Sequence, residues 1–314
     1  MERKLIRNII PRKTAGVKRR KGQKRFFHKT LYKSFFLCYT AFGDTVRHFS
    51  FGRHGMIKEF FGWGGYERDP EGFFSWQHLL FVSLLMAAMV LCAVYFGRKS
   101  RGKCEKDKNR VLAYAAILID GIELFKIVFL CIRAADPLLW LYELPLFLCS
   151  IQLIAIPIAA FSRGTLKQAA LDFVLIFGIL GALLGTYAAG NNYGSYPVLG
   201  FDNVVSGVTH SIAGFSSLYI AISGMASMKK KNMPFTFIIL LSFCALAFIA
   251  NALVDYNYMF LVRGDGTPYE LVYSLVGGNA VLYPIGVILL FILYILAFYG
   301  IYFLIQSKRA KKSA

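Results

Sequence analysis

The sequence predicts an all-α polytopic membrane protein with seven transmembrane helices. Of its 314 residues, 57% are hydrophobic and only 17% are charged, a composition that an ordinary soluble domain does not have. From residue 79 onward, apolar runs of the length that crosses a bilayer follow one another. The runs are continuous and do not alternate with polar residues, which favours helices over a β-barrel.

The seven expected spans are separated by short polar connections. Each span is close to the ~20 residues that a helix needs to cross the hydrocarbon core. The spans are expected at residues 79–97, 112–132, 138–161, 169–189, 203–225, 234–254 and 279–305. Together they form one membrane domain, residues 79–305.

The basic residues in the connections predict the orientation of this domain. Sixteen Lys and Arg residues fall after the first, third and fifth spans and after the last one, whereas four fall on the opposite side. Cytoplasmic loops carry the excess of Lys and Arg. The short basic tail at residues 306–314 is therefore expected in the cytoplasm, and the chain that enters the first span is expected outside.

The N-terminal 55 residues are a separate basic tail, which we expect to be disordered. They carry 15 of the 36 Lys and Arg residues and two acids, which explains most of the net charge of +19. Such a tail fits poorly before a span that starts outside. It could pair with a further membrane-associated segment at 26–51, lie on the membrane surface, or precede a natural start at Met56, the interpretation we favour.

The remaining features of these regions point to the membrane and away from other partners. Residues 56–78 are rich in aromatic residues and glycine and are expected to lie at a membrane interface. The basic run at 18–21 suits anionic headgroups as well as it suits nucleic acid, so no nucleic-acid partner is predicted. The six cysteines lack paired spacings, and the sequence therefore predicts no metal and no cofactor.

Polar and ionisable side chains inside the spans are the candidates for function, because they are costly in hydrocarbon. Most of them fall between the bilayer centre and its outer surface, as the lining of an outward-opening polar cavity would. They are His78, Asp120, Glu123, Lys126, Cys149, Gln152, His210, Asn251, Asp255, Asn257 and Tyr283.

Several of these residues also have a purely structural interpretation. Glu123 and Lys126, three residues apart on one helical face, are expected to form an internal ion pair more readily than to catalyse a reaction. Asn251 would ordinarily be an interhelical hydrogen-bond partner. Function and structural hydrogen bonding are equally expected of His210, because a histidine in the middle of a span is costly.

Cys149 and His210 lie at overlapping depths and could form a nucleophilic pair. In such a pair the thiol attacks as a thiolate, a base withdraws its proton, and a third group orients the base. Cys149 would be the nucleophile, His210 the base, and Asp255 or Asn251 the orienting group. The rest of the cavity would be lined by His78, Glu123, Lys126, Gln152, Asn251, Asn257 and Tyr283.

A set of short motifs extends this interpretation through a family resemblance. The segment ELPLFLCSIQLI at 143–154, VTHSIAGFSSLY at 208–219 and NALVDYNYMFL at 251–261 resemble hallmarks of the YwaF-type bacterial integral membrane proteins. So do Trp76 and His78, the Glu123/Lys126 pair and Tyr283-Pro284. The resemblance covers about residues 56–303 and implies a multi-pass protein of the bacterial cytoplasmic membrane.

That family is similar to a eukaryotic family of multi-span acyltransferases that move acyl chains between phospholipids and lyso ether lipids through a membrane-embedded cysteine. The resemblance implies that Cys149 is the nucleophile and His210 its partner. It also implies membrane lipids, phospholipid or lysophospholipid, as substrates.

Two non-enzymatic alternatives remain open from the sequence. A small-molecule carrier or receptor would bind a polar solute in the outward cavity through His78, His210, Asn251, Asp255 and Asn257. Transporters often contain internal repeats, and no repeat relates the two halves of this chain. A scaffold without a ligand would explain the glycines but not the position of the polar residues in the outer half.

Overall fold

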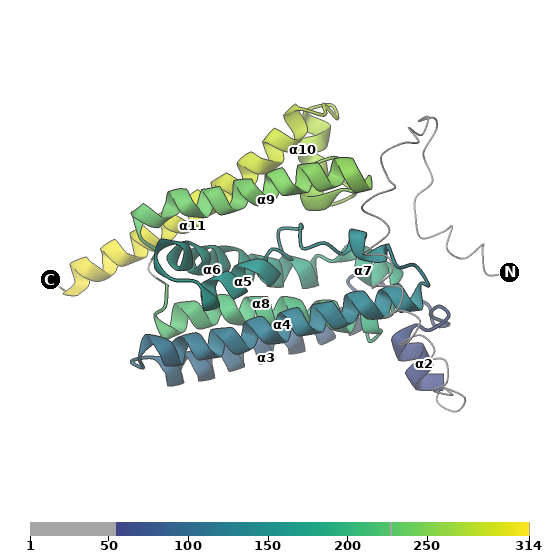
Figure 1. The fold of residues 1–314 in the computed structure, drawn as a ribbon, viewed down its shortest axis with the longest axis horizontal. Helices are drawn as coiled ribbons and strands as arrows, with labels where there is room; N and C mark the ends of the chain where they lie inside the picture. The colour runs from purple at the N-terminus through teal and green to yellow at the C-terminus, as the bar shows by residue number, and fades with distance from the viewer. Residues whose placement is uncertain (1–54, 227, 314) are drawn as a thin grey trace, which may run out of the picture. The chain divides into compact units, whose positions relative to one another are not determined.

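The computed structural model describes residues 55–226 and 228–313. The expectations for the basic tail concern residues 1–54 almost entirely and lie outside the described residues. In the part that is described, the regular elements are all helical (Figure 1). The all-α prediction is confirmed.

Six of the seven expected spans are long helices. They are α3 (Trp76–Ser100), α4 (Glu105–Arg133), α6 (Gly164–Tyr187), α8 (Phe201–Ser223), α9 (Met233–Val254) and α11 (Leu282–Ser313). Shorter elements lie between them: α2 (Gly55–Phe61), η3 (Leu139–Tyr142), α5 (Gln152–Phe161), α7 (Gly190–Ser195), η4 (Lys230–Asn232), η5 (Tyr258–Phe260) and α10 (Glu270–Leu275).

The expected third span, at 138–161, is not one helix. It consists of the short helix η3, a run of turns through Cys149, and then α5, which has only 10 residues. Pro145 contributes to the break, because the residue before a proline is disfavoured in the α conformation. The prediction of one continuous helix over this apolar segment is therefore wrong.

Five helices of the described chain are long and apolar enough to cross a membrane: α3, α6, α8, α9 and α11. The helix α4 has 29 residues and is therefore long enough. It differs in composition from the five apolar helices because it contains the charged residues Asp120, Glu123 and Lys126. The protein is thus a multi-pass membrane protein, and five of its described helices are apolar enough to span the bilayer.

The centre of the bundle is the contact between α6 and α8, and it is built on glycine. A Cβ atom on Gly178 would lie 2.7 Å from the carbonyl oxygen of Ala213 and 2.8 Å from Cβ of Ser217. On the other side of α8, a Cβ atom on Gly207 would lie 2.7 Å from Leu85 of α3. At Gly178 the backbone of α8 leaves no room for a larger residue, and at Gly207 the end of the Leu85 side chain would have to move, as expected for close helix packing in membranes.

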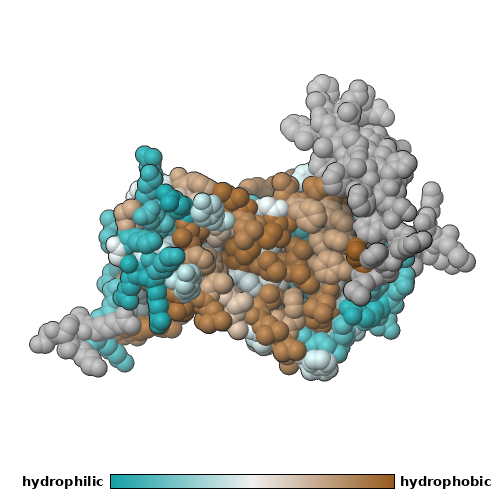
Figure 2. All heavy atoms as spheres, turned by 90° about the horizontal axis from the view of Figure 1, so that it is seen from below, coloured by the Kyte–Doolittle hydropathy of each residue, from teal (hydrophilic) through white to brown (hydrophobic). Residues whose placement is uncertain are grey.

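The bundle has two polar ends and an apolar belt between them. Figure 2 shows a hydrophobic band between two hydrophilic zones. The α3–α4 connection and the C-terminus lie at one end, and α2, α7 and α10 lie at the other (Figure 1). At the first end the Lys167 ammonium donates to Asn109 Oδ1 (2.8 Å), which places the start of α6 beside the start of α4. The predicted excess of basic residues is therefore gathered at one end.

A buried carboxylate that the sequence reasoning did not single out joins three segments at this basic end. Asp172 of α6 is fully buried and accepts hydrogen bonds from the backbone N–H of Met228 (3.2 Å), from Asn232 Nδ2 (3.0 Å) and from the Tyr299 hydroxyl (2.9 Å). A buried carboxylate requires such donors, because desolvation is costly. Asp172 therefore ties α6 to the α8–α9 connection and to α11.

The opposite end is closed by the lead-in segment before α3. Arg133, at the end of α4, forms a bidentate pair with Asp202 (2.7 Å for both contacts) and also donates to the carbonyl of Phe61 (3.0 Å). The Tyr66 hydroxyl donates to Asp202 as well (2.6 Å). Burial, and then this hydrogen bond, raise the pKa of Tyr66 far above its usual range, so its hydroxyl stays protonated.

Candidate functional site

The break in the third expected span positions Cys149 in a turn directly before α5. The backbone continues through helical hydrogen bonds, from Ile151 N–H to the Phe147 carbonyl (2.9 Å) and from Gln152 N–H to the Cys149 carbonyl (3.3 Å). The Ser150 hydroxyl fixes the start of this turn by accepting from Phe147 N–H (3.0 Å) and donating to the Phe147 carbonyl (3.1 Å). Non-helical backbone at membrane depth is tolerated only where it is buried in protein or lines a cavity.

The imidazole of His210 is oriented by its own helix. Its Nδ1 lies 2.7 Å from the carbonyl oxygen of Ser206, one turn earlier in α8, and 3.5 Å from the Ser206 hydroxyl. A carbonyl can only accept, so Nδ1 carries the hydrogen and Nε2 is the basic nitrogen. His210 therefore presents a proton acceptor on the side away from Ser206.

Two glycines of α6 lie against the cysteine and the histidine. A Cβ atom on Gly181 would lie 3.3 Å from Cβ of Cys149, and a Cβ atom on Gly185 would clash with Cδ2 and Nε2 of His210. These glycines are four residues apart and share one face of the helix. The same α6 face thus receives Cys149 from one side and His210 from α8, and brings the two together.

Cys149 and His210 interact directly through their side chains. The thiol and the imidazole form the contact that nucleophilic catalysis requires, with the basic Nε2 edge of the ring free of Ser206. Neither residue is fully buried. The fold therefore brings together two partly buried residues that are 61 positions apart in the chain.

The backbone N–H groups of Cys149 and Ser150 have no hydrogen-bond acceptor among the described residues. They precede the first turn of α5, where N–H groups have no partner within the helix and can bind an acceptor.

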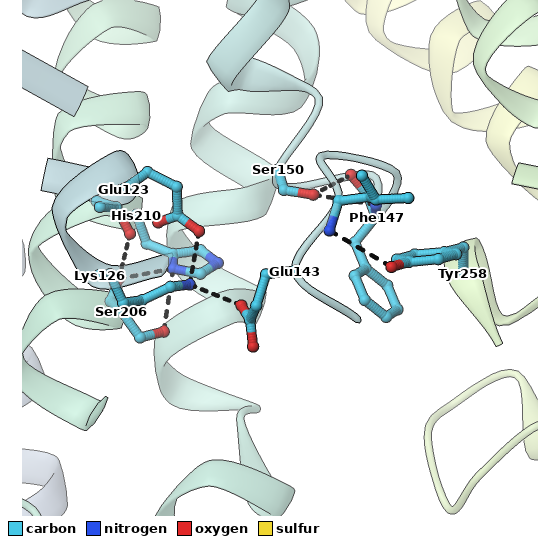
Figure 3. Close-up of polar contacts among 10 residues, drawn as sticks. Glu123, Lys126, Glu143, Phe147, Ser150, Ser206, His210 and Tyr258 are labelled. Carbon is cyan, nitrogen blue, oxygen red and sulfur yellow. Dashed lines mark hydrogen bonds and ion pairs between the residues drawn. The ribbon is translucent and has the colours of Figure 1, made fainter. Parts of the chain in front are cut away.

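A charged cluster from α4 and the segment after η3 lies next to the histidine (Figure 3). The Lys126 ammonium contacts Glu123 at 2.6 Å and Glu143 at 3.0 Å, and the exposed fractions of these three side chains are 16%, 12% and 28%. The predicted Glu123–Lys126 pair is present, with Glu143 as a second acid. In Figure 3, Glu123 lies beside the His210 ring.

Aromatic residues from the α9–α11 connection cover the other side of the cysteine turn. Phe147 packs against the rings of Tyr256, Tyr258 and Phe260, with centroids 5.3 to 6.1 Å apart. Tyr269 stacks on Phe260, with ring centroids 5.5 Å apart. Burial raises the pKa of Tyr269 to about 12, so its phenol is protonated at neutral pH.

Four residues assigned to the cavity or to catalysis lie elsewhere. His78 is fully buried, accepts from Phe74 N–H (3.1 Å) and lies 3.1 Å from the Thr186 carbonyl, so both ring nitrogens are used. Asn251 exchanges two hydrogen bonds with the backbone of Tyr258 (2.6 and 3.1 Å). Asn257 likewise binds backbone and side-chain groups at 262–265. Asp255 is exposed at the end of α9.

The orienting group of His210 is therefore neither Asp255 nor Asn251. The structure places the Ser206 carbonyl at Nδ1, and Figure 3 shows Glu123 beside the ring. Asn251 stabilises the loop that contacts Phe147, and Asp255 ends a helix in the left-handed conformation (φ 57°). Sequence reasoning placed them near His210 because their expected depths matched, but depth does not specify which helices are neighbours.

Other site features were also missed in the sequence. Glu143 was visible only as part of a motif, and Tyr269 lies in a loop that hydropathy does not resolve. Gly181 and Gly185 were recognised as packing residues, but their contacts with Cys149 and His210 were not foreseen. A charged residue directly before an apolar run that contains Pro145 and Cys149 was the available signal.

The described residues contain no group of three His, Cys, Asp or Glu side chains that could hold a metal ion. Neither a curated protein nor a solved structure matches the chain. A family model does match, over residues 73–302, a range that includes Cys149, His210 and the charged cluster. The chain belongs to the TMEM164 family, a family of transmembrane proteins.

Proposed function

We propose that this protein is a membrane-embedded transacylase that moves acyl chains between membrane lipids through a thioester on Cys149. The observation that carries the proposal is the thiol–imidazole pair, which is held against Gly181 and Gly185 of α6 with Nδ1 of His210 fixed on the Ser206 carbonyl. The motif resemblance to lipid acyltransferases points to the same chemistry. The two sets of support are independent, since one is geometric and the other is a sequence pattern.

The first half-reaction loads the cysteine. His210 Nε2 takes the thiol proton, and the sulfur attacks the carbonyl carbon of a lipid ester, forming a C–S bond while the carbonyl electron pair moves to oxygen. Collapse of this tetrahedral intermediate breaks the C–O bond to the donor lipid. His210 returns its proton to the leaving oxygen, and a lysolipid departs.

The second half-reaction transfers the chain. The hydroxyl of an acceptor lysolipid attacks the thioester carbon while His210 takes its proton. A C–O bond forms, the C–S bond breaks, and the proton returns to the sulfur. No cofactor is consumed, because one ester is exchanged for another.

The surroundings of the pair suit a lipid substrate. The site lies at mid-depth in the bundle, since His210 is nine residues into α8, about 14 Å from the start of that helix. An apolar belt surrounds this level (Figure 2). We place the basic end in the cytoplasm by the positive-inside rule, with α4 and the broken 138–161 segment as further membrane-embedded elements.

The carrier or receptor alternative has less support. It requires the polar side chains of the outer half to converge on one solute. The structure instead engages His78, Asn251 and Asn257 in internal hydrogen bonds, and Asp255 is exposed at a helix end.

Acyl transfer between lipids in proteoliposomes tests the proposal. The donor is a phospholipid with an isotopically labelled acyl chain, and the acceptor is a lysophospholipid. The labelled chain is expected on the acceptor with the wild-type protein, and neither Cys149→Ala nor His210→Gln should retain more than about one part in a hundred of the rate.

Cys92→Ala is the matched control, because Cys92 is exposed on α3 and takes no part in the site. Its rate should equal that of the wild type. Transfer that persists in Cys149→Ala would refute the covalent mechanism, and binding of a solute without any transfer would favour the carrier.

A further inference from the structure

Gln152 is a buried amide without a partner in the described part of the chain. Its side chain is fully buried, and neither Oε1 nor Nε2 has a hydrogen-bond partner there. Leaving a buried donor or acceptor unpaired costs about 1–3 kcal/mol. A leucine or methionine would fill the same volume without this cost, so the amide calls for a functional explanation.

The position of Gln152 connects it to the nucleophile. It is the first residue of α5, three residues after Cys149, and its N–H donates to the Cys149 carbonyl. Ile151 between them has helical φ and ψ of −55° and −23°. Residues three apart in a helical turn share one face, so Gln152 lies on the side of the turn that carries the thiol.

Acyl transfer requires hydrogen-bond donors at this side of the cysteine. When the sulfur attacks an ester or thioester carbonyl, negative charge develops on the carbonyl oxygen, and fixed donors that stabilise it contribute a large part of the catalysis. The N–H groups of Cys149 and Ser150 have no hydrogen-bond acceptor in the described part of the chain, so both donors are available. An amide NH₂ group can add a third donor.

We infer that the Gln152 carboxamide, together with the N–H groups of Cys149 and Ser150, binds the carbonyl oxygen of the acyl group and forms the oxyanion hole of the reaction. This inference rests on the proposed thioester chemistry. In this role Gln152 contacts the carbonyl oxygen of the acyl group, and His210 transfers the proton. Ser150 contributes only its backbone, because its hydroxyl is used at Phe147.

Acylation and alkylation of Cys149 distinguish oxyanion binding by Gln152 from a purely structural role. Thioester formation from an activated acyl donor builds an oxyanion, whereas alkylation by iodoacetamide displaces iodide at a saturated carbon and builds none. We expect Gln152→Met to slow acylation of Cys149 by about 100-fold. Alkylation of Cys149 should stay within twofold of the wild-type rate, and the melting temperature should not fall, since an unpaired amide is replaced by an apolar side chain of similar size.

Gln152→Glu provides a second variant, which keeps the shape of the side chain but replaces the NH₂ donor by an acceptor. It should slow acylation at least as much as Gln152→Met. If acylation and alkylation slowed equally, Gln152 would affect only the position or reactivity of the thiol. If acylation were unchanged, Gln152 would bind no oxyanion. Either result overturns the inference. If the wild-type protein forms no thioester, the proposed function itself fails.

Discussion

Gly185 leaves the space that the His210 ring occupies, and this single missing side chain allows the histidine to reach Cys149. The α6 face that carries Gly181 and Gly185 contributes no functional group. This face matters because its two glycines have no side chains there. A search of the sequence for polar residues therefore does not find it. The basic Nε2 edge lies against this face, so the position of the ring depends on it.

Gly185→Ala is therefore expected to displace the His210 ring and lower the transfer rate at least about 10-fold, because small misplacements of catalytic groups are costly. Gly300→Ala in α11 is the matched control, since an added Cβ meets nothing within 4 Å there. It should keep full activity and gain up to about 1 kcal/mol of stability, as Gly-to-Ala changes in helices do. Activity in Gly185→Ala equal to the control would contradict the described geometry.

The charged cluster beside His210 depends on its one cation. Removing the Lys126 ammonium would leave Glu123 and Glu143 facing each other in a largely buried setting. We expect Lys126→Met to lower the free energy of unfolding by about 1–3 kcal/mol.

The double variant Lys126→Met/Glu123→Gln removes one of the two unpaired charges and should recover part of that loss, as measured by thermal unfolding in detergent. A double variant less stable than Lys126→Met would mean that the two carboxylates do not depend on the lysine.

At the scale of elements, hydropathy predicts the positions of helices well, but it does not predict where a helix is interrupted. The expected spans at 79–97, 169–189, 203–225 and 234–254 agree with α3, α6, α8 and α9 to within a few residues. Hydropathy predicts a helix over 138–161, because the average hydropathy of a segment is the same whether its apolar residues form a helix or turns. Pro145 and the charge at Glu143 were the local signals of a break, and the break is where Cys149 lies.

The loop after α9 supports that break from the opposite side. Asn251 holds the backbone of Tyr258, and the Tyr258 hydroxyl donates to the Leu141 carbonyl beside the cysteine segment. Asn251→Ala should therefore reduce stability by about 1–3 kcal/mol and reduce transfer as well, because a buried N–H loses its acceptor.

Asn191→Ala is the control for this change, since Asn191 is exposed in α7. Its melting temperature should equal that of the wild type. If Asn251→Ala also melted as the wild type does, the loop would not depend on this hydrogen bond.

At the scale of the whole molecule, Arg133 is one of the residues that join the lead-in segment to the bundle. Arg133 holds both Asp202 in the first turn of α8 and the Phe61 carbonyl at the end of α2. Arg133→Gln should release the segment before α3 and accelerate tryptic cleavage at Arg68. Arg263→Gln, at an arginine that is half exposed, should leave cleavage unchanged. Equal cleavage in both variants would show that the segment is held by other contacts.

The two polar ends allow the orientation to be tested with native and introduced cysteines. Cys104 is exposed in the basic α3–α4 connection, and Asn191 lies at the opposite end. A membrane-impermeant maleimide added from outside should label Asn191→Cys and spare Cys104 until the membrane is opened. Labelling of Cys104 from outside would invert the proposed topology.

Part of the site follows from the sequence and part requires the fold. Cys149 and His210 could be paired in advance because both are polar at similar depth in apolar runs. Ser206, Gly185 and Tyr269 could not, since their roles depend on which helices are neighbours and on a loop that returns to the bundle. Ser206 contributes a backbone carbonyl, Gly185 the absence of a side chain, and Tyr269 its position in a loop. None of these features has a distinct sequence pattern.

The most direct test of the covalent mechanism is the mass of the intact protein after incubation with a phospholipid donor and no acceptor. Wild-type protein should gain the mass of one acyl chain, and neutral hydroxylamine should remove it, because hydroxylamine cleaves thioesters. Cys149→Ala should gain nothing, and Cys149→Ser should carry at most a hydroxylamine-resistant ester. An acyl adduct on another residue, or lipid transfer by the wild type without any adduct on Cys149, would contradict the proposal.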